Sequence, residues 1–83
     1  MYNLKMKNIK IYTTPTCVYC KMTKELFKKN NIQYQEADVA DDEKAREEMV
    51  EKSGQLGVPV IDINGEIFVG YNEQLLKEAL GLK

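Results

Sequence analysis

The chain has 83 residues, with twelve basic side chains, thirteen acidic side chains and a net charge of −1. Because domains usually hold about 100–200 residues, a single domain over residues 1–83 is predicted. The balanced charge argues against nucleic acid or a membrane surface as a partner, since both usually bind a basic excess. The absence of histidine excludes Ser-His and Cys-His dyads and histidine metal ligands.

No stretch of the sequence approaches the roughly 20 consecutive apolar residues that a membrane helix requires. Residues 1–7 alternate polar and apolar side chains, lack the apolar block of a signal peptide, and are predicted to form a loose N-terminal extension. We therefore expect a cytoplasmic protein. Thiols stay reduced in that compartment, and structural disulfides are rare there.

The first half of the chain predicts a strand, a helix and a second strand. Residues 8–12 have strand character and end at a turn-prone Thr-Thr-Pro-Thr segment. A helix is predicted from Cys17 to about Asn30, with Thr16 as its N-cap. Its apolar face is predicted to consist of Val18, Met22, Leu26 and Phe27. The second strand covers residues 32–39.

A second helix is predicted in the middle of the chain. Asp41 or Asp42 caps its start, and it runs to about Lys52, with Gly54 as its stop signal. Its inward positions are Ala45 and Met49.

A hairpin and a last helix follow. Two apolar runs, residues 58–63 and 66–69, flank Asn64-Gly65, which is typical of a type I′ turn. Residues 73–80 place leucine and alanine at helical spacing, and Gly81 ends this helix.

The resulting element order, β-α-β-α-β-β-α, predicts an α/β fold. The first two strands are joined by a crossover helix and should be parallel, whereas the last two form an antiparallel hairpin. Helices on both faces of a four-stranded mixed sheet give a three-layer α/β/α sandwich.

The two cysteines, Cys17 and Cys20, lie at the junction between the first strand and the first helix. A cysteine at a helix start has free backbone N–H groups and the positive end of the helix dipole nearby, and both favour the thiolate. Three residues on, a second cysteine lies one helical turn away. We therefore assign Cys17 as the nucleophile and Cys20 as the more buried resolving thiol.

Three other interpretations of the cysteine pair stay open. A structural disulfide would be unusual in the cytoplasm, and so short a loop constrains the unfolded chain little. A zinc site would need a second chain, because zinc takes four ligands and this chain offers two thiols and no imidazole. Two inert core cysteines would also fit the spacing. Cys-x-x-Cys beside a βαβ pattern is nevertheless typical of a redox motif.

A proline motif, Gly57-Val58-Pro59, precedes the third strand. Proline inside a central strand would lose a ladder hydrogen bond, so we predict a cis Val58–Pro59 peptide bond. This geometry would leave the Val58 N–H and C=O free to pair with an extended substrate beside the sulfur. A trans proline at a strand start is the alternative, and trans is the more frequent geometry.

These motifs together resemble those of the glutaredoxins, small proteins of the thioredoxin fold. The resemblance covers Ile9 to Leu80 and rests on residues 11–20, Gly57-Val58-Pro59 and residues 70–73. It implies a thioredoxin-like, single glutaredoxin-like domain that reduces protein disulfides or glutathione mixed disulfides. It also implies glutathione as a co-substrate and no tightly bound cofactor or metal.

The resemblance further implies a glutathione-binding site. In it, Tyr19 flanks the bound tripeptide, the Val58 backbone beside Pro59 pairs with it, and the turn at Gly70 leads to the last helix. The start of that helix, at Asn72 and Glu73, would receive the γ-glutamyl carboxylate through backbone N–H groups.

The chain departs from the family's pattern around this site. Thr14 replaces a lysine, Gly57 a threonine, Val69 the first glycine of a Gly-Gly-x-Asp turn, Asn72 its aspartate, and Val18 an active-site proline. Losing the lysine removes a charge-assisted contact to the glycyl carboxylate, worth about 1.5–3 kcal/mol. Weak glutathione binding is therefore expected unless Lys10, Lys21 or Lys24 compensates.

Two further functions stay open. Redoxins that take electrons from thioredoxin reductase and supply ribonucleotide reductase share a Cys-Val-x-Cys turn, but this chain lacks their Trp-Ser-Gly-Phe-Arg-Pro segment. Alternatively, Cys17 of two chains and two glutathiones would hold an iron–sulfur cluster, which Val18 disfavours. The expected partners are thus disulfide-containing proteins and either glutathione or thioredoxin reductase, with the chain itself a monomer.

Overall fold

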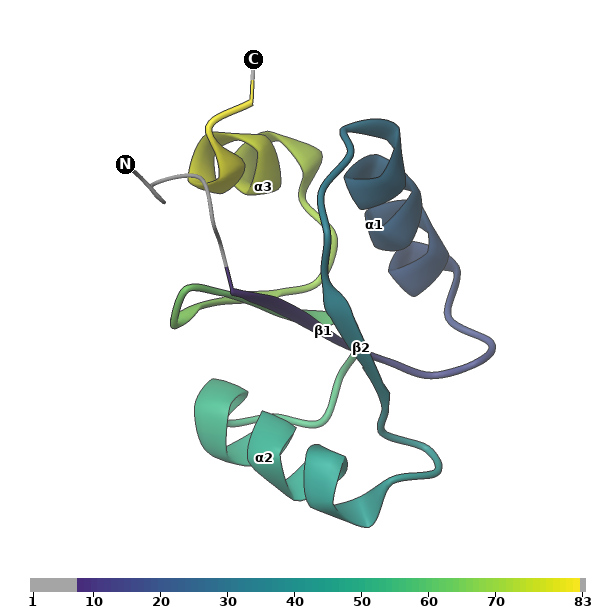
Figure 1. Ribbon diagram of the computed structural model, residues 1–83. Helices are drawn as coiled ribbons and strands as arrows, with labels where there is room; N and C mark the ends of the chain where they lie inside the picture. The colour runs from purple at the N-terminus through teal and green to yellow at the C-terminus, as the bar shows by residue number, and fades with distance from the viewer. Residues whose placement is uncertain (1–7, 83) are drawn as a thin grey trace.

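The computed structural model describes residues 8–82, which form four strands and three helices in three layers (Figure 1). In chain order the elements are β1 (Ile9–Thr13), α1 (Val18–Lys29), β2 (Gln35–Asp38), α2 (Glu43–Ser53), β3 (Val60–Ile63), β4 (Glu66–Val69) and α3 (Glu73–Leu80). The predicted order of elements is confirmed. The predicted loose extension, residues 1–7, lies outside the described residues.

The four strands form one mixed sheet in the order β2-β1-β3-β4. β1 runs parallel to β2 and antiparallel to β3, and β3 pairs antiparallel with β4. Tyr12 on β1 is the register partner of Val60 on β3. The segment just before β3 therefore lies at the carboxyl end of β1, where the chain turns into α1.

Helices cover both faces of the sheet, with α1 and α3 on one face and α2 on the other (Figure 1). Side chains of the central strands alternate between two apolar clusters, because successive strand residues point to opposite faces. The cluster under α1 and α3 contains Ile9, Ile11, Leu26, Phe27, Ile61, Ile63, Leu76 and Leu80. The cluster under α2 contains Tyr12, Val39, Ala45, Met49 and Val60.

The buried face of α1 differs from the prediction. Its buried residues are Cys20, Thr23, Leu26 and Phe27, whereas Val18 is 66% exposed and Met22 is 38% exposed. The prediction for Val18 and Met22 was therefore wrong. Thr23 is tolerated inside because its hydroxyl donates a hydrogen bond of 2.8 Å to the Tyr19 carbonyl, which removes the cost of burying an unpaired polar group.

Several element ends also differ from the predicted ones. The N-cap of α1 is Cys17 rather than Thr16, β2 begins at Gln35 rather than Ile32, and β3 begins at Val60 rather than Val58. The Asn64-Gly65 turn is confirmed. Both residues have positive φ angles, 54° and 94°, as a type I′ turn requires.

Polar contacts attach α2 to the sheet as well as apolar ones. The buried Tyr12 hydroxyl donates to Glu48 Oε1 at 2.6 Å and accepts from Lys52 Nζ at 2.9 Å. Lys52 also pairs with Asp62 at 2.8 Å, and the hydrogen bond to Asp62 is the largest cause that raises the pKa of Lys52. These contacts fix the last turn of α2, and hence the start of the loop that leads to β3.

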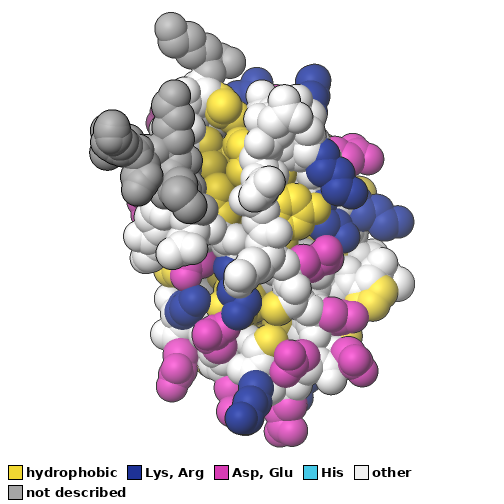
Figure 2. Space-filling model, in the orientation of Figure 1, with side chains coloured by type: hydrophobic (Ala, Val, Ile, Leu, Met, Phe, Trp, Pro, Cys, Tyr) yellow, Lys and Arg dark blue, Asp and Glu magenta, His cyan; other side chains and the backbone are white. Residues whose placement is uncertain are grey.

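The outer surface of α2 is strongly charged. Asp and Glu side chains, with a few lysines among them, gather over α2 at the bottom of the molecule in Figure 2. Within residues 8–82, none of the helices is both long enough and apolar enough to cross a bilayer.

Two methionines on different helices test where the core lies. Met49 is fully buried, so Met49→Ala leaves a cavity and should lower the free energy of unfolding by about 2–5 kcal/mol. Met22→Ala makes the same chemical change on the exposed side of α1 and should cost no more than about 1 kcal/mol. Urea unfolding of the reduced proteins measures both. Equal losses would contradict the assignment of the two faces.

Candidate active site

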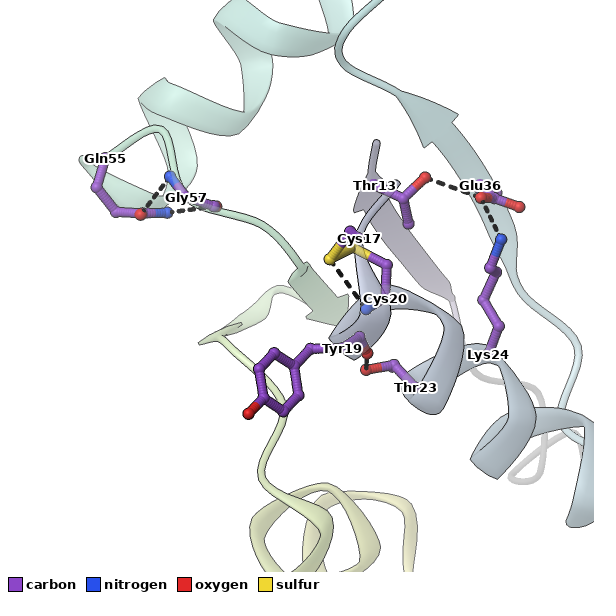
Figure 3. Close-up of a disulfide and its surroundings, with 9 residues drawn as sticks. All are labelled: Thr13, Cys17, Tyr19, Cys20, Thr23, Lys24, Glu36, Gln55 and Gly57. Atoms are coloured by element: carbon purple, nitrogen blue, oxygen red, sulfur yellow. Dashed lines mark hydrogen bonds and ion pairs between the residues drawn. A yellow bond between two sulfur atoms is a disulfide. The ribbon is translucent and has the colours of Figure 1, made fainter. Parts of the chain in front are cut away.

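The two cysteines are joined in a disulfide at the start of α1 (Figure 3). Their Cα atoms lie 5.2 Å apart, one helical turn from each other. Cys17 is half-buried, whereas Cys20 is only 1% exposed and belongs to the face of α1 that packs on the sheet. The pair can therefore cycle between disulfide and dithiol, with Cys17 as the more accessible sulfur.

Backbone hydrogen bonds hold Cys17 at the helix end. As the N-cap residue it has extended backbone angles, and its Sγ accepts a hydrogen bond of 3.1 Å from the Cys20 N–H. Its own N–H donates to the Thr14 carbonyl at 3.4 Å, and its carbonyl accepts from the Lys21 N–H at 3.2 Å. An N–H group aimed at sulfur, together with the positive helix end, stabilises a thiolate when the disulfide is reduced.

A polar cluster supports the site from the sheet side. Glu36 on β2 accepts hydrogen bonds from Thr13 Oγ1 at 2.8 Å and from Lys24 Nζ at 2.9 Å. The bond from Lys24 is the largest cause that lowers the pKa of Glu36. In Figure 3 these three residues lie on the opposite side of the disulfide from Tyr19. They tie β1, β2 and α1 together where the cysteine turn begins.

The predicted cis peptide bond between Val58 and Pro59 is confirmed. Pro59 is fully buried, and its carbonyl accepts a 2.8 Å hydrogen bond from the Gly70 N–H. Within residues 8–82, no hydrogen bond engages the N–H or C=O of Val58. The register of β1 and β3 therefore brings the unpaired N–H and C=O groups of Val58 to the end of the sheet that carries Cys17.

The predicted anion-binding end of α3 is stabilised by its own residues. Gly70 has a φ of +84°, and Asn72 is the N-cap, with a side chain that accepts from the Leu75 N–H at 3.0 Å. Glu73 pairs with Lys77 at 3.0 Å. Burial, followed by the nearby Glu73 carboxylate, raises the pKa of Tyr71. The hydrogen bond from Gly70 to Pro59 joins this turn to the proline loop.

Large apolar side chains are exposed on the segments next to the disulfide. Val18 and Leu56 are each 66% exposed, Tyr19 is 59% exposed, and Leu75 in the first turn of α3 is 48% exposed. In Figure 3, the Tyr19 ring and the loop at Gly57 lie on the same side of the disulfide. This side therefore offers apolar contacts beside the open backbone of Val58.

Sequence reasoning missed the Thr13–Glu36–Lys24 cluster and the side chain of Gln55, which hydrogen-bonds the backbone of Gly57. A glutamine in a loop carries no periodic or capping signal. Glu36 is a polar residue within the predicted second strand, and its neighbours in the sequence do not indicate which side chains it meets. The role of Glu36 depends on Thr13 and Lys24, which the fold brings close, whereas the partners of Gln55, namely Ser53 and Gly57, lie two residues away in the sequence.

A separate groove of about 940 Å³ lies between β2 and α2, and neither cysteine lines it. Its lining is mainly acidic, including Glu36, Asp38, Asp42 and Glu47. Among residues 8–82, no group of three or more cysteine, aspartate or glutamate side chains is arranged to hold a metal ion.

A sequence model of the glutaredoxin family matches residues 9–69 of this chain. The chain belongs to the glutaredoxin family. Its cysteine pair and proline loop lie within the matched region, and the thioredoxin-like sandwich predicted from the sequence is confirmed.

Known proteins agree with this assignment. A glutaredoxin-like 8.6 kDa protein in the rubredoxin operon of Clostridium pasteurianum is 58% identical over 65 residues, which cover 78% of this chain and 87% of that protein. Glutaredoxin 3 of Escherichia coli is 34% identical over 76 residues and 92% of each chain. The crystal structure of a glutaredoxin from Archaeoglobus fulgidus superposes with a TM-score of 0.81, 28% identity and 96% coverage of both chains.

The lowered pKa of Glu36 predicts a pH effect on stability. Because its folded pKa lies below its ordinary value, ionised Glu36 stabilises the fold at neutral pH, and this contribution is lost as the pH falls through the lowered pKa. Glu36→Gln should lower stability at neutral pH by about 1 kcal/mol or less, since the group is partly exposed. It should also reduce the loss of stability between about pH 5 and pH 3.

Urea unfolding at several pH values measures this effect. Glu25→Gln makes the same substitution at an exposed position on α1 and is the matched control. A Glu36→Gln protein with the wild-type pH profile would show that the contact with Lys24 contributes nothing.

Proposed function

We propose that this glutaredoxin-family protein is a dithiol oxidoreductase that reduces disulfide bonds in other proteins in the cytoplasm. The observation that carries the proposal is the position of Cys17 at the N-cap of α1, with the Cys20 N–H donating to its sulfur. This position favours the ionised form of Cys17, which is the form that attacks a disulfide. The gain in ionisation is largely offset by the lower nucleophilicity of a stabilised thiolate, so the main benefit is that Cys17 becomes a good leaving group.

The reaction takes place in two exchanges. The Cys17 thiolate attacks one sulfur of a substrate disulfide, a mixed disulfide forms, and the other substrate sulfur leaves as a thiolate that takes up a proton. Cys20 then loses its proton to solvent and attacks Cys17, which releases the second substrate thiol. The substrate gains two electrons and the protein is left with the Cys17–Cys20 disulfide, which a thiol reductant must reduce again.

Substrate binding uses the open side of the disulfide. The free N–H and C=O of Val58 suit an extended polypeptide, which adds to a backbone edge as a short strand does. Tyr19, Val18 and Leu56 are exposed around this edge and offer apolar contact area. Such contacts favour a polypeptide over a small hydrophilic disulfide.

The residue at position 14 bears on which electron donor reduces the Cys17–Cys20 disulfide again. Thr14 stands where the glutaredoxin pattern has a lysine for the glycyl carboxylate of glutathione, and two of the three lysines that could compensate, Lys10 and Lys24, are held in ion pairs. Weak binding of glutathione follows from this substitution. Thioredoxin reductase is therefore the alternative donor. The start of α3, at Asn72 and Glu73, is the other proposed contact for glutathione.

Replacement of each cysteine tests the proposal. Cys17→Ser should abolish reduction of both insulin and small disulfides, because the other thiol, Cys20, is only 1% exposed. Cys20→Ser should slow insulin reduction strongly, since the mixed disulfide is no longer resolved internally. It should retain glutathione-dependent reduction of a glutathionylated peptide. Coupled NADPH-consumption assays measure these rates, and wild-type rates for Cys17→Ser would refute the proposal.

Restoring a lysine at position 14 tests the choice of donor. Thr14→Lys should lower the KM for glutathione about tenfold or more, which corresponds to one charge-assisted hydrogen bond. Thr16→Lys adds the same charge two residues away and serves as the control. The assay compares glutathione plus its reductase with thioredoxin reductase. An unchanged KM in Thr14→Lys would show that position 14 does not contact glutathione.

A further inference from the structure

The side chain of Gln55 lies against the backbone of the loop that leads to the proline (Figure 3). Its Oε1 accepts a hydrogen bond of 2.6 Å from the Gly57 N–H, and its Nε2 donates to the Gly57 carbonyl at 3.1 Å. One amide thus satisfies both backbone groups of one residue, as a neighbouring strand would do. We refer to this pair of hydrogen bonds as the Gln55–Gly57 clamp.

Hydrogen bonds attach the Gln55 side chain to the C-terminal end of α2. Gln55 Nε2 also lies 3.1 Å from the Ser53 hydroxyl oxygen, which itself lies 2.7 Å from the Met49 carbonyl oxygen. Gly54 ends the helix in a left-handed conformation, and its N–H donates to Val50 at 2.7 Å. Since Lys52 ties the same turn to Tyr12 and Asp62, the amide of Gln55 projects from a fixed base.

The residue at position 57 is coupled to the clamp. A Cβ atom built on Gly57 would lie 2.7 Å from Gln55 Oε1, so the amide at the end of this flexible side chain would have to move. Gly57 is not among the glycines with a positive φ, so its backbone does not itself require glycine. A side chain at position 57 would therefore displace the Gln55 amide from the backbone of residue 57.

The clamp also decides which backbone groups remain open. With both polar groups of Gly57 occupied, the unpaired N–H and C=O next to the site belong to Val58. An extended chain that pairs here is therefore directed to one register. The register of this pairing decides which residue of the bound chain lies opposite Cys17, because a shift by one residue moves every side chain of a strand to a new position.

We propose that Gln55 is a positioning residue for polypeptide substrates: its amide holds the loop from Leu56 to Val58 so that substrate backbone pairs at Val58 in a single register. The inference rests on the proposed function, since it concerns the binding step of disulfide reduction. Gln55 does not touch the sulfurs in this role. Its effect is on substrate binding and not on the thiol exchange itself.

The test compares two substrates in Gln55→Ala. The KM for a disulfide-containing peptide should rise about three- to tenfold, the equivalent of one net hydrogen bond, with kcat unchanged. The rate with 5,5′-dithiobis(2-nitrobenzoate), a small disulfide that makes no strand pairing, should stay at the wild-type value. Gln33→Ala, an exposed glutamine before β2, is the matched control and should change neither rate.

A second substitution separates positioning from a general loss of structure. Gly57→Ala alone should raise the peptide KM by a similar factor, because its Cβ displaces the Gln55 amide. Added to Gln55→Ala, the same substitution should have little further effect, since the amide is already gone. Such non-additivity is the signature of two residues that act through one contact.

Three results would overturn the inference: an unchanged peptide KM in Gln55→Ala, an equal loss of rate with both substrates, or additive effects of the two substitutions. Thermal unfolding of each variant accompanies the kinetics, and a lowered Tm that parallels the loss of both rates would assign Gln55 a merely structural role. If the wild-type protein reduces neither disulfide, the proposed function fails and the inference fails with it. Wild-type activity with an unaffected Gln55→Ala variant refutes the inference alone.

Discussion

The hydrogen bond from the Cys20 N–H to Cys17 Sγ is the contact on which the site depends. It forms only when Cys17 caps α1 and Cys20 occupies the first turn of the same helix. Cys20 is held there because it is part of the buried face of α1, beside Thr23 and Phe27. One residue thus contributes a core side chain, a backbone donor and the second sulfur, and the packing of α1 sets the geometry of the thiol chemistry.

The antiparallel pairing of β1 and β3 supplies the other half of the site. It brings the Val58–Pro59 bond, which is distant in the sequence, to the end of the sheet where Cys17 lies. The Gly70 N–H then joins the proline carbonyl to the turn before α3. The reacting sulfur, the open backbone and the helix end therefore lie on three loops that one rigid sheet holds in place.

Polar contacts between the sheet and α2 also help to position the site. Glu48 accepts hydrogen bonds from Lys10 and Tyr12, and the bond from Lys10 is the largest cause that lowers its pKa. Its stabilising contribution is therefore present at neutral pH and is lost as the pH falls through the lowered value. Since Gln55 follows the last turn of α2, contacts on the face of the sheet opposite α1 hold the loop that carries Val58.

The sequence by itself determined the element order, the hairpin turn, the cysteine pair and the proline motif, because each of these depends on neighbouring residues. Periodicity and turn chemistry are local properties, and they placed Ala45 and Met49 correctly on the inward side of α2. The family resemblance added the identity of the fold. These signals were sufficient to locate the candidate site on the chain.

Tertiary structure decided which side of α1 is buried, which residue caps it and which side chains support the site. Val18 and Met22 have the hydrophobicity of core residues, yet the sheet selects Cys20 and Thr23, because a buried hydroxyl with a partner costs little. The contacts of Glu36 with Thr13 and Lys24 likewise form only when β1, β2 and α1 come together. Contacts between residues far apart in sequence leave no local pattern, so only the folded chain shows them.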